Sequence, residues 1–199
     1  MVELSRKTAE TDIKLKLALY GEGNYQITTG IGFFDHMLEL FCRHGFFDLE
    51  LKASGDLEVD KHHTVEDIGI LLGQAIKKEL GDKSGITRYA DITLPMDEVL
   101  VQVALDLGGR SYYRGDIETQ RQEVNGFPVE LIEEFFSSLA ANAEINLHFI
   151  ILRKGNTHHL LEALFKAFAR ALDAALKPEE RLAGNPLSTK GQLGESGRH

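Results

Sequence analysis

The chain contains almost no cysteine and has no excess of positive charge. Cys42 is the only cysteine among 199 residues, so no disulfide can form within the chain, which fits a reducing cytosol. The net charge of −9 argues against a nucleic-acid-binding protein, because no basic stripe is available to displace counterions. No stretch approaches the roughly 20 apolar residues of a membrane span, and the first residues lack the apolar region of a signal peptide. We therefore expect a cytoplasmic protein with neither a nucleic-acid nor a membrane partner.

Several familiar catalytic motifs are also absent. The sequence has no Gly-x-Ser-x-Gly, no Rossmann fingerprint, no Walker loop and no zinc-finger spacing. These absences exclude the common nucleophile and dinucleotide-binding classes. The hydrophobic fraction of 43% and the charged fraction of 27% are ordinary for a soluble globular protein, and the length permits a substantial core.

Two short stretches, in contrast, repeat one unusual pattern. Residues 60–66 read D-K-H-H-T-V-E and residues 156–162 read N-T-H-H-L-L-E. Each copy has a residue suited to cap a helix (Asp60 or Asn156), then two adjacent histidines, then a glutamate four positions after the first histidine. The copies are 96 residues apart, and the whole chain has only eight histidines. The doubling therefore indicates an internal duplication that builds a site for two metal ions.

The spacing within each copy explains how such a site is built. Both copies lead into amphipathic runs of helical period, so the first histidine and the glutamate share one helix face as an i,i+4 pair. The second histidine is rotated by about 100°. The pairs are His62 with Glu66 and His158 with Glu162, and the rotated histidines are His63 and His159. If the two halves face each other, each metal takes a pair from one copy and the rotated histidine from the other.

The residue types in the doubled motif also limit the metal. Imidazole and carboxylate ligands without thiolate suit manganese, iron or zinc and disfavour a structural zinc site of the cysteine type. The alternative is that these histidines cap helices or make hydrogen bonds in half-buried positions. Because two copies match, this alternative is the weaker interpretation. His36, near the start of a predicted helix, and His148, in a predicted strand, could complete the metal shells. Taken alone, each is more often a packed or surface histidine.

Alternating and amphipathic stretches follow the same order in the two halves. The first half has predicted strands at 12–20, 25–29 and 47–51, with helices at 33–43 and between Asp60 and Gly81; the second has strands at 99–107, 111–117 and 145–152, with helices at 129–141 and between Asn156 and Pro178. Each half is thus strand–strand–helix–strand–helix. We expect an α+β fold that duplicates a βαβ-type unit, with two mixed sheets each covered on one face by two helices. The expected division is a first repeat over 1–90, a second over 91–183 and a C-terminal phosphate-contacting loop and tail over 184–199, all in one pseudo-symmetric unit.

A few polar residues outside the doubled motif stand at turns or strand ends. The cations among them are Arg88, Arg110, Lys154 and Lys190, and the default for each is a solvated surface charge. The loop 188–191, Ser-Thr-Lys-Gly, offers backbone N–H groups, hydroxyls and an ammonium that could wrap a phosphate. His44, before Gly45, is suited to the C-terminal end of a helix dipole. Glu10 is a carboxylate just before a strand, and no local feature marks it as a base.

Five motifs occur in the order found in one enzyme family: G-F-F-D-H-M-L, D-x-H-H-T-x-E-D-I, L-D-L-G-G-R, G-N-T-H-H-x-x-E-A and S-T-K-G. Over essentially its whole length the chain resembles imidazoleglycerol-phosphate dehydratases of L-histidine biosynthesis. The resemblance implies a duplicated α+β fold of the ribosomal protein S5 domain 2-like type. It also implies a homo-oligomer of 24 subunits built from trimers, with active sites at subunit interfaces. The chain differs from many members at Leu40, where they have Gln, and at Pro186-Leu187, where they have Ile-Pro.

The resemblance further implies a role for each candidate residue, with two Mn²⁺ ions in each active site. One ion would be bound by His36, His62, Glu66 and His159, and the other by His63, His148, His158 and Glu162. Glu10, in contact with the substrate, resembles the acid/base carboxylate, so the expected catalytic residues are Glu10, Glu66 and Glu162. The expected contacts to the substrate phosphate are Arg88, Arg110, Ser188 and Lys190, with His44 and Lys154 as additions.

The implied reaction is the dehydration of D-erythro-imidazole-glycerol phosphate to imidazole-acetol phosphate by a hydro-lyase. Two manganese ions would stabilise the substrate ring as an imidazolate while Glu10 removes the carbon-bound proton. Two other classes use similar residues. A dinuclear metallohydrolase acting on a phosphate ester would activate a bridging water with the same ligands. A non-enzymatic, metal-stabilised oligomer would have closed coordination shells and would not need the Arg/Lys cluster.

Overall fold

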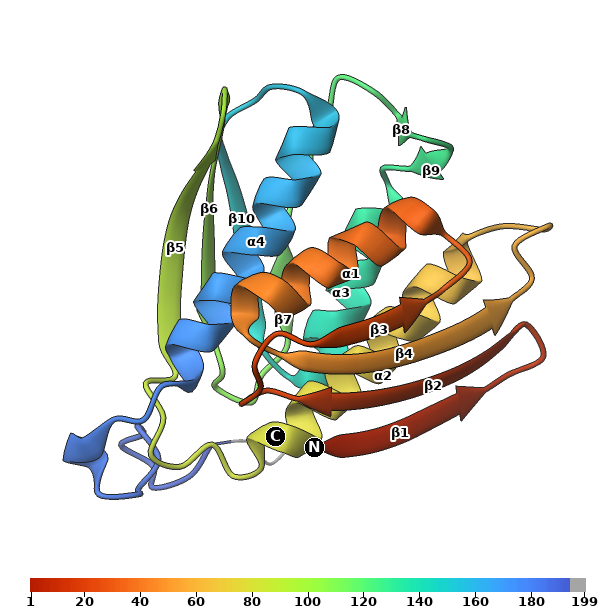
Figure 1. The fold of residues 1–199 in the computed structure, drawn as a ribbon. Helices are drawn as coiled ribbons and strands as arrows, with labels where there is room; N and C mark the ends of the chain where they lie inside the picture. Colours follow the sequence, from red (N-terminus) through yellow and green to blue (C-terminus); the bar gives the residue numbers. More distant parts are fainter. Residues whose placement is uncertain (194–199) are drawn as a thin grey trace, which may run out of the picture.

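Two four-stranded sheets enclose four helices in the computed structural model, which describes residues 1–193 (Figure 1). The first sheet, in spatial order, has β1 (Val2–Lys7), β2 (Thr11–Ala18), β4 (Asp48–Gly55) and β3 (Tyr25–Thr28). The second has β5 (Tyr89–Met96), β6 (Val99–Asp106), β10 (Asn146–Arg153) and β7 (Tyr112–Arg114). The helices are α1 (Gly32–Gly45), α2 (His62–Leu80), α3 (Leu131–Ala143) and α4 (Thr157–Leu176). The remaining elements are a two-stranded ribbon, β8 (Glu123–Val124) with β9 (Phe127–Pro128), and a 3₁₀ helix, η1 (Glu180–Leu182).

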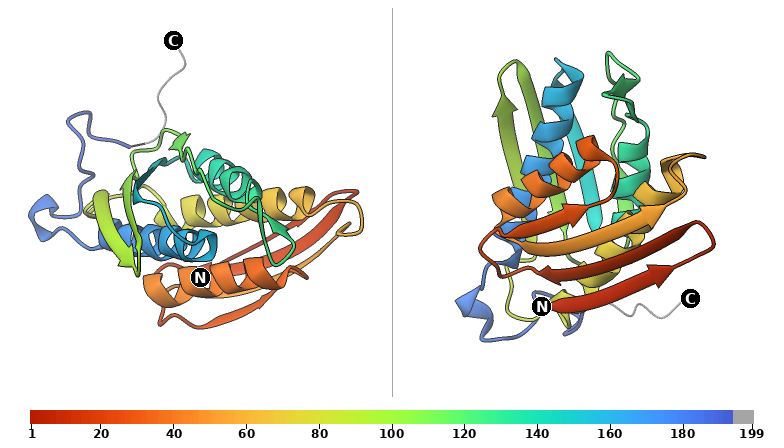
Figure 2. Two further views of the ribbon diagram at one scale, coloured as in Figure 1. Left: turned by 90° about the horizontal axis from the view of Figure 1, so that it is seen from above. Right: turned by 45° about the vertical axis from the view of Figure 1, so that its right-hand side comes forward.

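The helices lie between the sheets, so each sheet is covered on one face only (Figure 2). α1 and α2 pack against the first sheet, α3 and α4 pack against the second, and the layers meet where α2 contacts α3 and α1 contacts α4. Because one face of each sheet is buried, burial alternates along the strands. Ile13, Leu15 and Leu17 of β2 are fully buried, and each such side chain contributes roughly 1.5–3 kcal/mol.

Both sheets have the same pairing pattern. In each, three neighbouring strands are antiparallel, β1-β2-β4 in the first and β5-β6-β10 in the second. The other edge strand is parallel to its neighbour, because a helix connects the two: α1 joins β3 to β4, and α3 joins β7 to β10. The expected α+β class, with two mixed sheets each covered by two helices, is confirmed.

The order within each half differs from the prediction, because each half begins with one more strand. The additional strands, β1 and β5, are both edge strands. β1 places Arg6 at an inward position, so its alternation is not purely apolar, and β5 contains Pro95, which a sheet tolerates at an edge. Each half is therefore three strands, a helix, a strand and a helix. The expected division at residue 90 lies at the second residue of β5.

Both His-His motifs begin a helix, as predicted. The backbone N–H of His62 donates to Asp60 Oδ1 at 3.0 Å, and that of His158 donates to Asn156 Oδ1 at 2.9 Å. These bonds satisfy N–H groups that the first helical turn leaves without a backbone partner. Neither helix, nor any other within residues 1–193, is long and apolar enough to cross a membrane.

α2 and α3 approach each other closely because α2 carries glycine on the contact face. A Cβ on Gly69 would lie 2.7 Å from the carbonyl oxygen of Phe135, and one on Gly73 would lie 2.5 Å from that of Leu139. Real Cβ atoms do not approach a backbone oxygen so closely. These two glycines therefore set the separation of the helices, and with it the position of the first His-His motif.

The C-terminal segment folds back along the connection between α2 and β5. The backbone N–H of Gly85 donates to the Asn185 carbonyl at 3.0 Å, and Arg88 Nη1 donates to the Leu187 carbonyl at 2.6 Å. The predicted phosphate-contacting loop therefore runs beside Arg88. The last part of the predicted tail, 194–199, lies outside the described residues.

Candidate metal centre and active site

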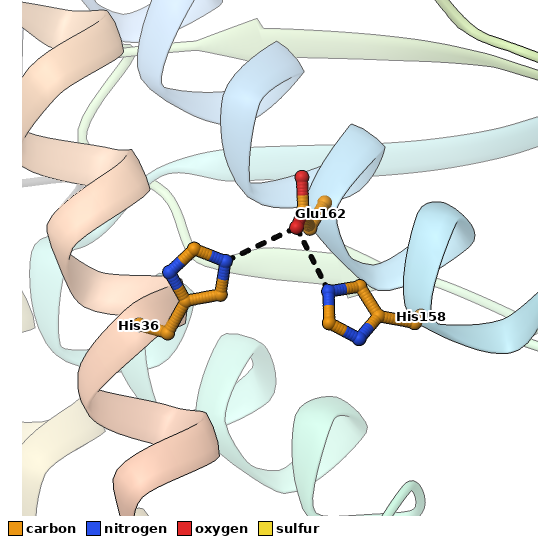
Figure 3. Close-up of side chains that lie close together, drawn as sticks. All are labelled: His36, His158 and Glu162. Carbon is orange, nitrogen blue, oxygen red and sulfur yellow. Dashed lines mark hydrogen bonds and ion pairs between the residues drawn. The ribbon is translucent and has the colours of Figure 1, made fainter.

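The tightest group of predicted metal ligands joins α1 to α4 (Figure 3). His36 Nε2 lies 3.1 Å from Glu162 Oε1, and His158 Nε2 lies 2.8 Å from the same oxygen. Helical spacing accounts for the His158–Glu162 contact, and the packing of α1 against α4 brings His36 to it. The group therefore combines a residue from the first half of the chain with two from the second. It differs from the predicted sets, in which His36 binds the ion of His62 and Glu66 rather than that of His158 and Glu162.

Glu162 is the buried member of this group, whereas the His36 and His158 side chains are each about 40% exposed. The Phe33 ring stands edge-on to the His158 ring, with centroids 5.4 Å apart, and also packs against Phe127. Glu162 is only 8% exposed. Because the carboxylate itself is largely removed from water, its interactions with nearby charges are stronger than they would be at an open surface.

Glu162 remains ionised in spite of its burial. Burial alone would raise the pKa of this carboxyl, but hydrogen bonds from Lys166, His36 and His158 outweigh it and lower the pKa to about 2. Lys166 Nζ lies 2.5 Å from Glu162 Oε2, the oxygen that the histidines do not touch. Lys166 is not among the predicted site residues, although its i,i+4 spacing from Glu162 is a usable signal.

The first His-His motif faces a different set of carboxylates. His63 Nδ1 lies 3.1 Å from Asp56 Oδ2 and 3.7 Å from Glu10 Oε2. The hydrogen bond with Asp56 is the main reason that the pKa of His63 is raised, and the charge of Glu10 adds to it. His62 Nε2 and Glu66 Oε2 are 3.9 Å apart, so the predicted i,i+4 pair is present but loose. The predicted acid/base residue thus lies beside a predicted metal ligand.

The second motif repeats this pattern at His159. His159 Nδ1 lies 3.1 Å from Glu98 Oε2 and 3.8 Å from Asp97 Oδ2. The backbone N–H of Asn156 donates to Glu98 at 2.6 Å. This bond is the first reason that the pKa of Glu98 falls to about 2, and the contact with His159 lowers it further. Neither Glu98 nor Asp56 was singled out from the sequence, because each belongs to a loop outside the motifs.

His148 lies away from all of these groups. Leu147 and Phe149 are buried towards the helices, so His148 faces the outer side of the second sheet, where its ring stacks on Tyr112 at 5.2 Å. There it lines an open cavity of ≈ 410 Å³ together with Lys154. Within residues 1–193, no group of three potential metal ligands contains His148.

Three of the predicted phosphate contacts gather at the C-terminal segment. Arg88 makes a two-pronged ion pair with Asp106, at 2.8 and 3.1 Å, besides its bond to the Leu187 carbonyl. Ser188 Oγ accepts from the backbone N–H of Lys190 at 3.1 Å. Arg88, just before β5, therefore contacts the backbone of the short loop that carries Ser188 and Lys190, and Asp106 fixes the direction of its guanidinium.

The other predicted phosphate contacts are spread more widely. Arg110 is exposed before β7, and Lys154 pairs with Glu118. His44 lies near the end of α1, where its carbonyl accepts from Arg170 Nη1 at 3.1 Å. Burial lowers the pKa of His44, and neighbouring cations of α4 lower it further. The single chain does not bring these three residues to the loop that follows Leu187.

The predicted ligands form separate groups within one chain. The groups of three whose donor atoms lie within 4.8 Å of one another are His36, His158 and Glu162; Glu10, Asp56 and His63; and Asp97, Glu98 and His159. In the described part of the chain, no such group has a ligand from both His-His motifs, because the motifs begin two separate helices. The crossed ligand sets are thus not assembled by the single chain and stay a prediction for an oligomer.

Fold and site together define a class: a duplicated α+β protein with paired groups of histidines and carboxylates suited to divalent metal ions. The family model of imidazoleglycerol-phosphate dehydratase matches residues 29–172. The chain is 56% identical over 191 residues to the imidazoleglycerol-phosphate dehydratase of Acetivibrio thermocellus, covering 96% of this chain and 97% of the relative. It is 55% identical over 191 residues to that of Caldanaerobacter subterraneus subsp. tengcongensis, with 96% and 98% covered.

Solved structures agree with these relatives. The crystal structure of the enzyme from Pyrococcus furiosus matches with a TM-score of 0.81 and 36% identity, covering 96% of this chain and 100% of that one. The enzyme from Staphylococcus aureus matches with a TM-score of 0.79 and 38% identity, covering 89% and 100%. The chain belongs to the imidazoleglycerol-phosphate dehydratase family. It is accordingly a hydro-lyase of histidine biosynthesis.

Proposed function

We propose that the chain converts D-erythro-imidazole-glycerol phosphate into imidazole-acetol phosphate with two Mn²⁺ ions in each active site. The main support is the convergence of two imidazole Nε2 atoms on one oxygen of the buried Glu162 carboxylate. His36, His158 and Glu162 offer three donor atoms within 4.8 Å of one another. Imidazole and carboxylate together fit a divalent transition ion, and no thiolate is present to favour a softer one.

The charge of Glu162 makes this group suitable for a cation. With a pKa of about 2, the carboxyl is ionised at neutral pH. Lys166 holds Oε2, so Oε1 is the oxygen that is directed to the two imidazoles. When bound, manganese would act as a Lewis acid towards the nitrogen atoms of the substrate ring. His62 and Glu66 form the corresponding pair for the second ion.

Glu10 is placed to move the proton. It lies in the turn between β1 and β2, its side chain is about half exposed, and its Oε2 is 3.7 Å from His63 Nδ1. In the proposed reaction the electron-rich ring expels hydroxide from the carbon attached to it, and the Glu10 carboxylate accepts the proton from the next carbon of the glycerol arm. The electron pair of that C–H bond forms the double bond of an enol and returns the displaced electrons to the ring, so that water is lost, and tautomerisation of the enol gives the ketone.

The cations anchor the phosphate and convert its binding energy into positioning of the reacting carbon. Arg88, Ser188 and Lys190 are already close together, and Asp106 fixes the direction of the Arg88 guanidinium. The remaining phosphate contacts of the proposal are Arg110, Lys154 and His44. Because these lie apart in one chain, they would reach the same substrate across a contact between subunits.

A homo-oligomer of 24 subunits built from trimers is part of the proposal. Its support is that the described chain has no group with ligands from both His-His motifs, so complete metal sites need a neighbouring subunit. A cytoplasmic location is proposed with it, since the only cysteine, Cys42, is buried and unpaired.

The test is turnover of imidazole-glycerol phosphate by the purified protein, stripped with a chelator and then supplied again with Mn²⁺. We expect imidazole-acetol phosphate to form only after Mn²⁺ is restored. Release of inorganic phosphate without the ketone would instead indicate the metallohydrolase alternative. No turnover by folded, metal-loaded protein would refute the proposed reaction.

A further inference from the structure

The second histidine of each motif makes the same contact through the same atom. His63 Nδ1 lies 3.1 Å from a carboxylate oxygen of Asp56, and His159 Nδ1 lies 3.1 Å from one of Glu98. Neither carboxylate belongs to a His-His motif. Asp56 follows β4, whereas Glu98 lies in the turn between β5 and β6. The two halves of the chain thus form one kind of contact from two different loops.

This contact determines where the proton of each ring lies. An ionised carboxylate only accepts hydrogen bonds, so Nδ1 must carry the proton. In a neutral ring, Nε2 then keeps its lone pair and is the nitrogen able to bind a metal. In metal sites generally, a carboxylate on the outer ring nitrogen fixes the tautomer, orients the ring and makes the other nitrogen more basic.

We propose that Asp56 and Glu98 are positioning residues, which hold the proton on Nδ1 of His63 and His159 and leave Nε2 as the metal-binding atom. This role rests on the two-metal function proposed above. Both carboxylates are themselves well placed for it. Asp56 directs both oxygens to His63 Nδ1, at 3.1 and 3.3 Å. Glu98 is anchored through Oε1 by the backbone N–H of Asn156, so Oε2 is left for His159.

The neighbouring carboxylates do not make the same contact. Glu10 and Asp97 lie 3.7 and 3.8 Å from the respective Nδ1 atoms, which is beyond hydrogen-bonding distance. The first histidine of the second motif is also different, because His158 directs Nε2 to its own Glu162. Only Asp56 and Glu98 can therefore fix the proton on the second histidines, among the contacts of the described chain.

The first experiment measures Mn²⁺ affinity by competition with a chelator, using the full-length protein. Asp56→Ala should weaken Mn²⁺ binding by about 10- to 100-fold, whereas Asp56→Asn, whose amide oxygen can still accept from Nδ1, should bind close to wild type. Glu50→Gln is the control, since it removes an exposed carboxylate that pairs with Lys16 away from the site. Equal affinity of Asp56→Ala and wild type would overturn the proposal for His63.

Glu98→Gln tests the second half differently. If the amide oxygen keeps the bond from Asn156 N–H, the amide NH₂ faces His159 Nδ1 and forces that nitrogen to become an acceptor. We expect this variant to lose Mn²⁺ affinity by about 10- to 100-fold. We also expect the ¹⁵N NMR spectrum of metal-free, histidine-labelled protein at mildly alkaline pH to show the proton of His159 on Nε2 instead of Nδ1. A wild-type spectrum with the proton of His63 or His159 on Nε2 would refute the positioning role.

The same measurements separate this role from the function on which it rests. If wild type binds no Mn²⁺, the two-metal function and the positioning role both fail. If wild type binds Mn²⁺ and forms the ketone, but the variants bind equally well and keep the wild-type tautomers, only the positioning role fails. Thermal unfolding of each variant shows whether a loss of affinity follows from unfolding, and Asp56→Asn restores binding only if the acceptor oxygen is what matters.

Discussion

Replacing Glu162 with Gln removes one negative charge from the centre of the His36–His158–Glu162 group at almost constant size. The pKa of Glu162 is lowered from 4.5 to about 2, and each pKa unit corresponds to about 1.4 kcal/mol. The ionised carboxylate should therefore stabilise the metal-free fold by roughly 3 kcal/mol at neutral pH. Since the side chain is only 11% exposed, screening by solvent reduces this little.

The pH dependence of this effect has a definite sign. Because the folded-state pKa of Glu162 lies below the unfolded value, the stabilisation is fully present above about pH 4.5 and is lost as the pH falls through about 2. At neutral pH, the free energy of unfolding measured in urea should be roughly 3 kcal/mol higher for chelated wild type than for chelated Glu162→Gln. This difference should shrink by about 1.4 kcal/mol for each pH unit below 4.5. Glu50→Gln, which removes an exposed carboxylate, should change stability by less than about 1 kcal/mol. A Glu162→Gln difference below about 1 kcal/mol, or one that does not depend on pH, would refute the reasoning.

Three further changes test other parts of the account. Gly73→Ala places a Cβ 2.5 Å from the Leu139 carbonyl oxygen and should lower the free energy of unfolding by about 1–3 kcal/mol; an unchanged unfolding midpoint would show that α2 and α3 can separate freely. Glu10→Gln should lower kcat by about 10²- to 10⁴-fold with the Mn²⁺ content unchanged, and full activity in steady-state kinetics would exclude Glu10 as the base. Lys190→Met should raise KM for the phosphorylated substrate with little change in kcat, and an unchanged KM would remove Lys190 from the phosphate contacts.

The elements best predicted from the sequence are those whose pattern is set by local burial. β2 and β6 alternate because one face of each meets helices. Asn156 caps α4 as predicted, whereas the N-cap of α2 is Lys61, one residue after the predicted Asp60, which still accepts from the His62 N–H. β1 and β5 were missed because they are edge strands with half-buried inner residues, including Arg6 in β1. Their place in the sheets depends on pairing with β2 and β6, which a local pattern does not show.

Within the candidate site, only the contacts between residues of the same helix could be predicted from the sequence. The i,i+4 relation gives His158 with Glu162 and His62 with Glu66. It does not give His36 against Glu162, because that contact depends on how α1 packs on α4. The carboxylates beside the second histidines come from loops whose paths are fixed by the tertiary fold. The distance between the two motifs within one chain likewise follows from the packing of the helices, and the spacing of residues in the sequence does not predict it.

The most direct test of the two-metal account is a titration of chelated protein with Mn²⁺ while the formation of imidazole-acetol phosphate is followed. Turnover should be absent without the metal and should rise until two Mn²⁺ are bound per active site. Turnover that saturates with one ion, or that proceeds without any, would contradict the assignment of the doubled His-His-x-x-Glu motif to a pair of metal ions.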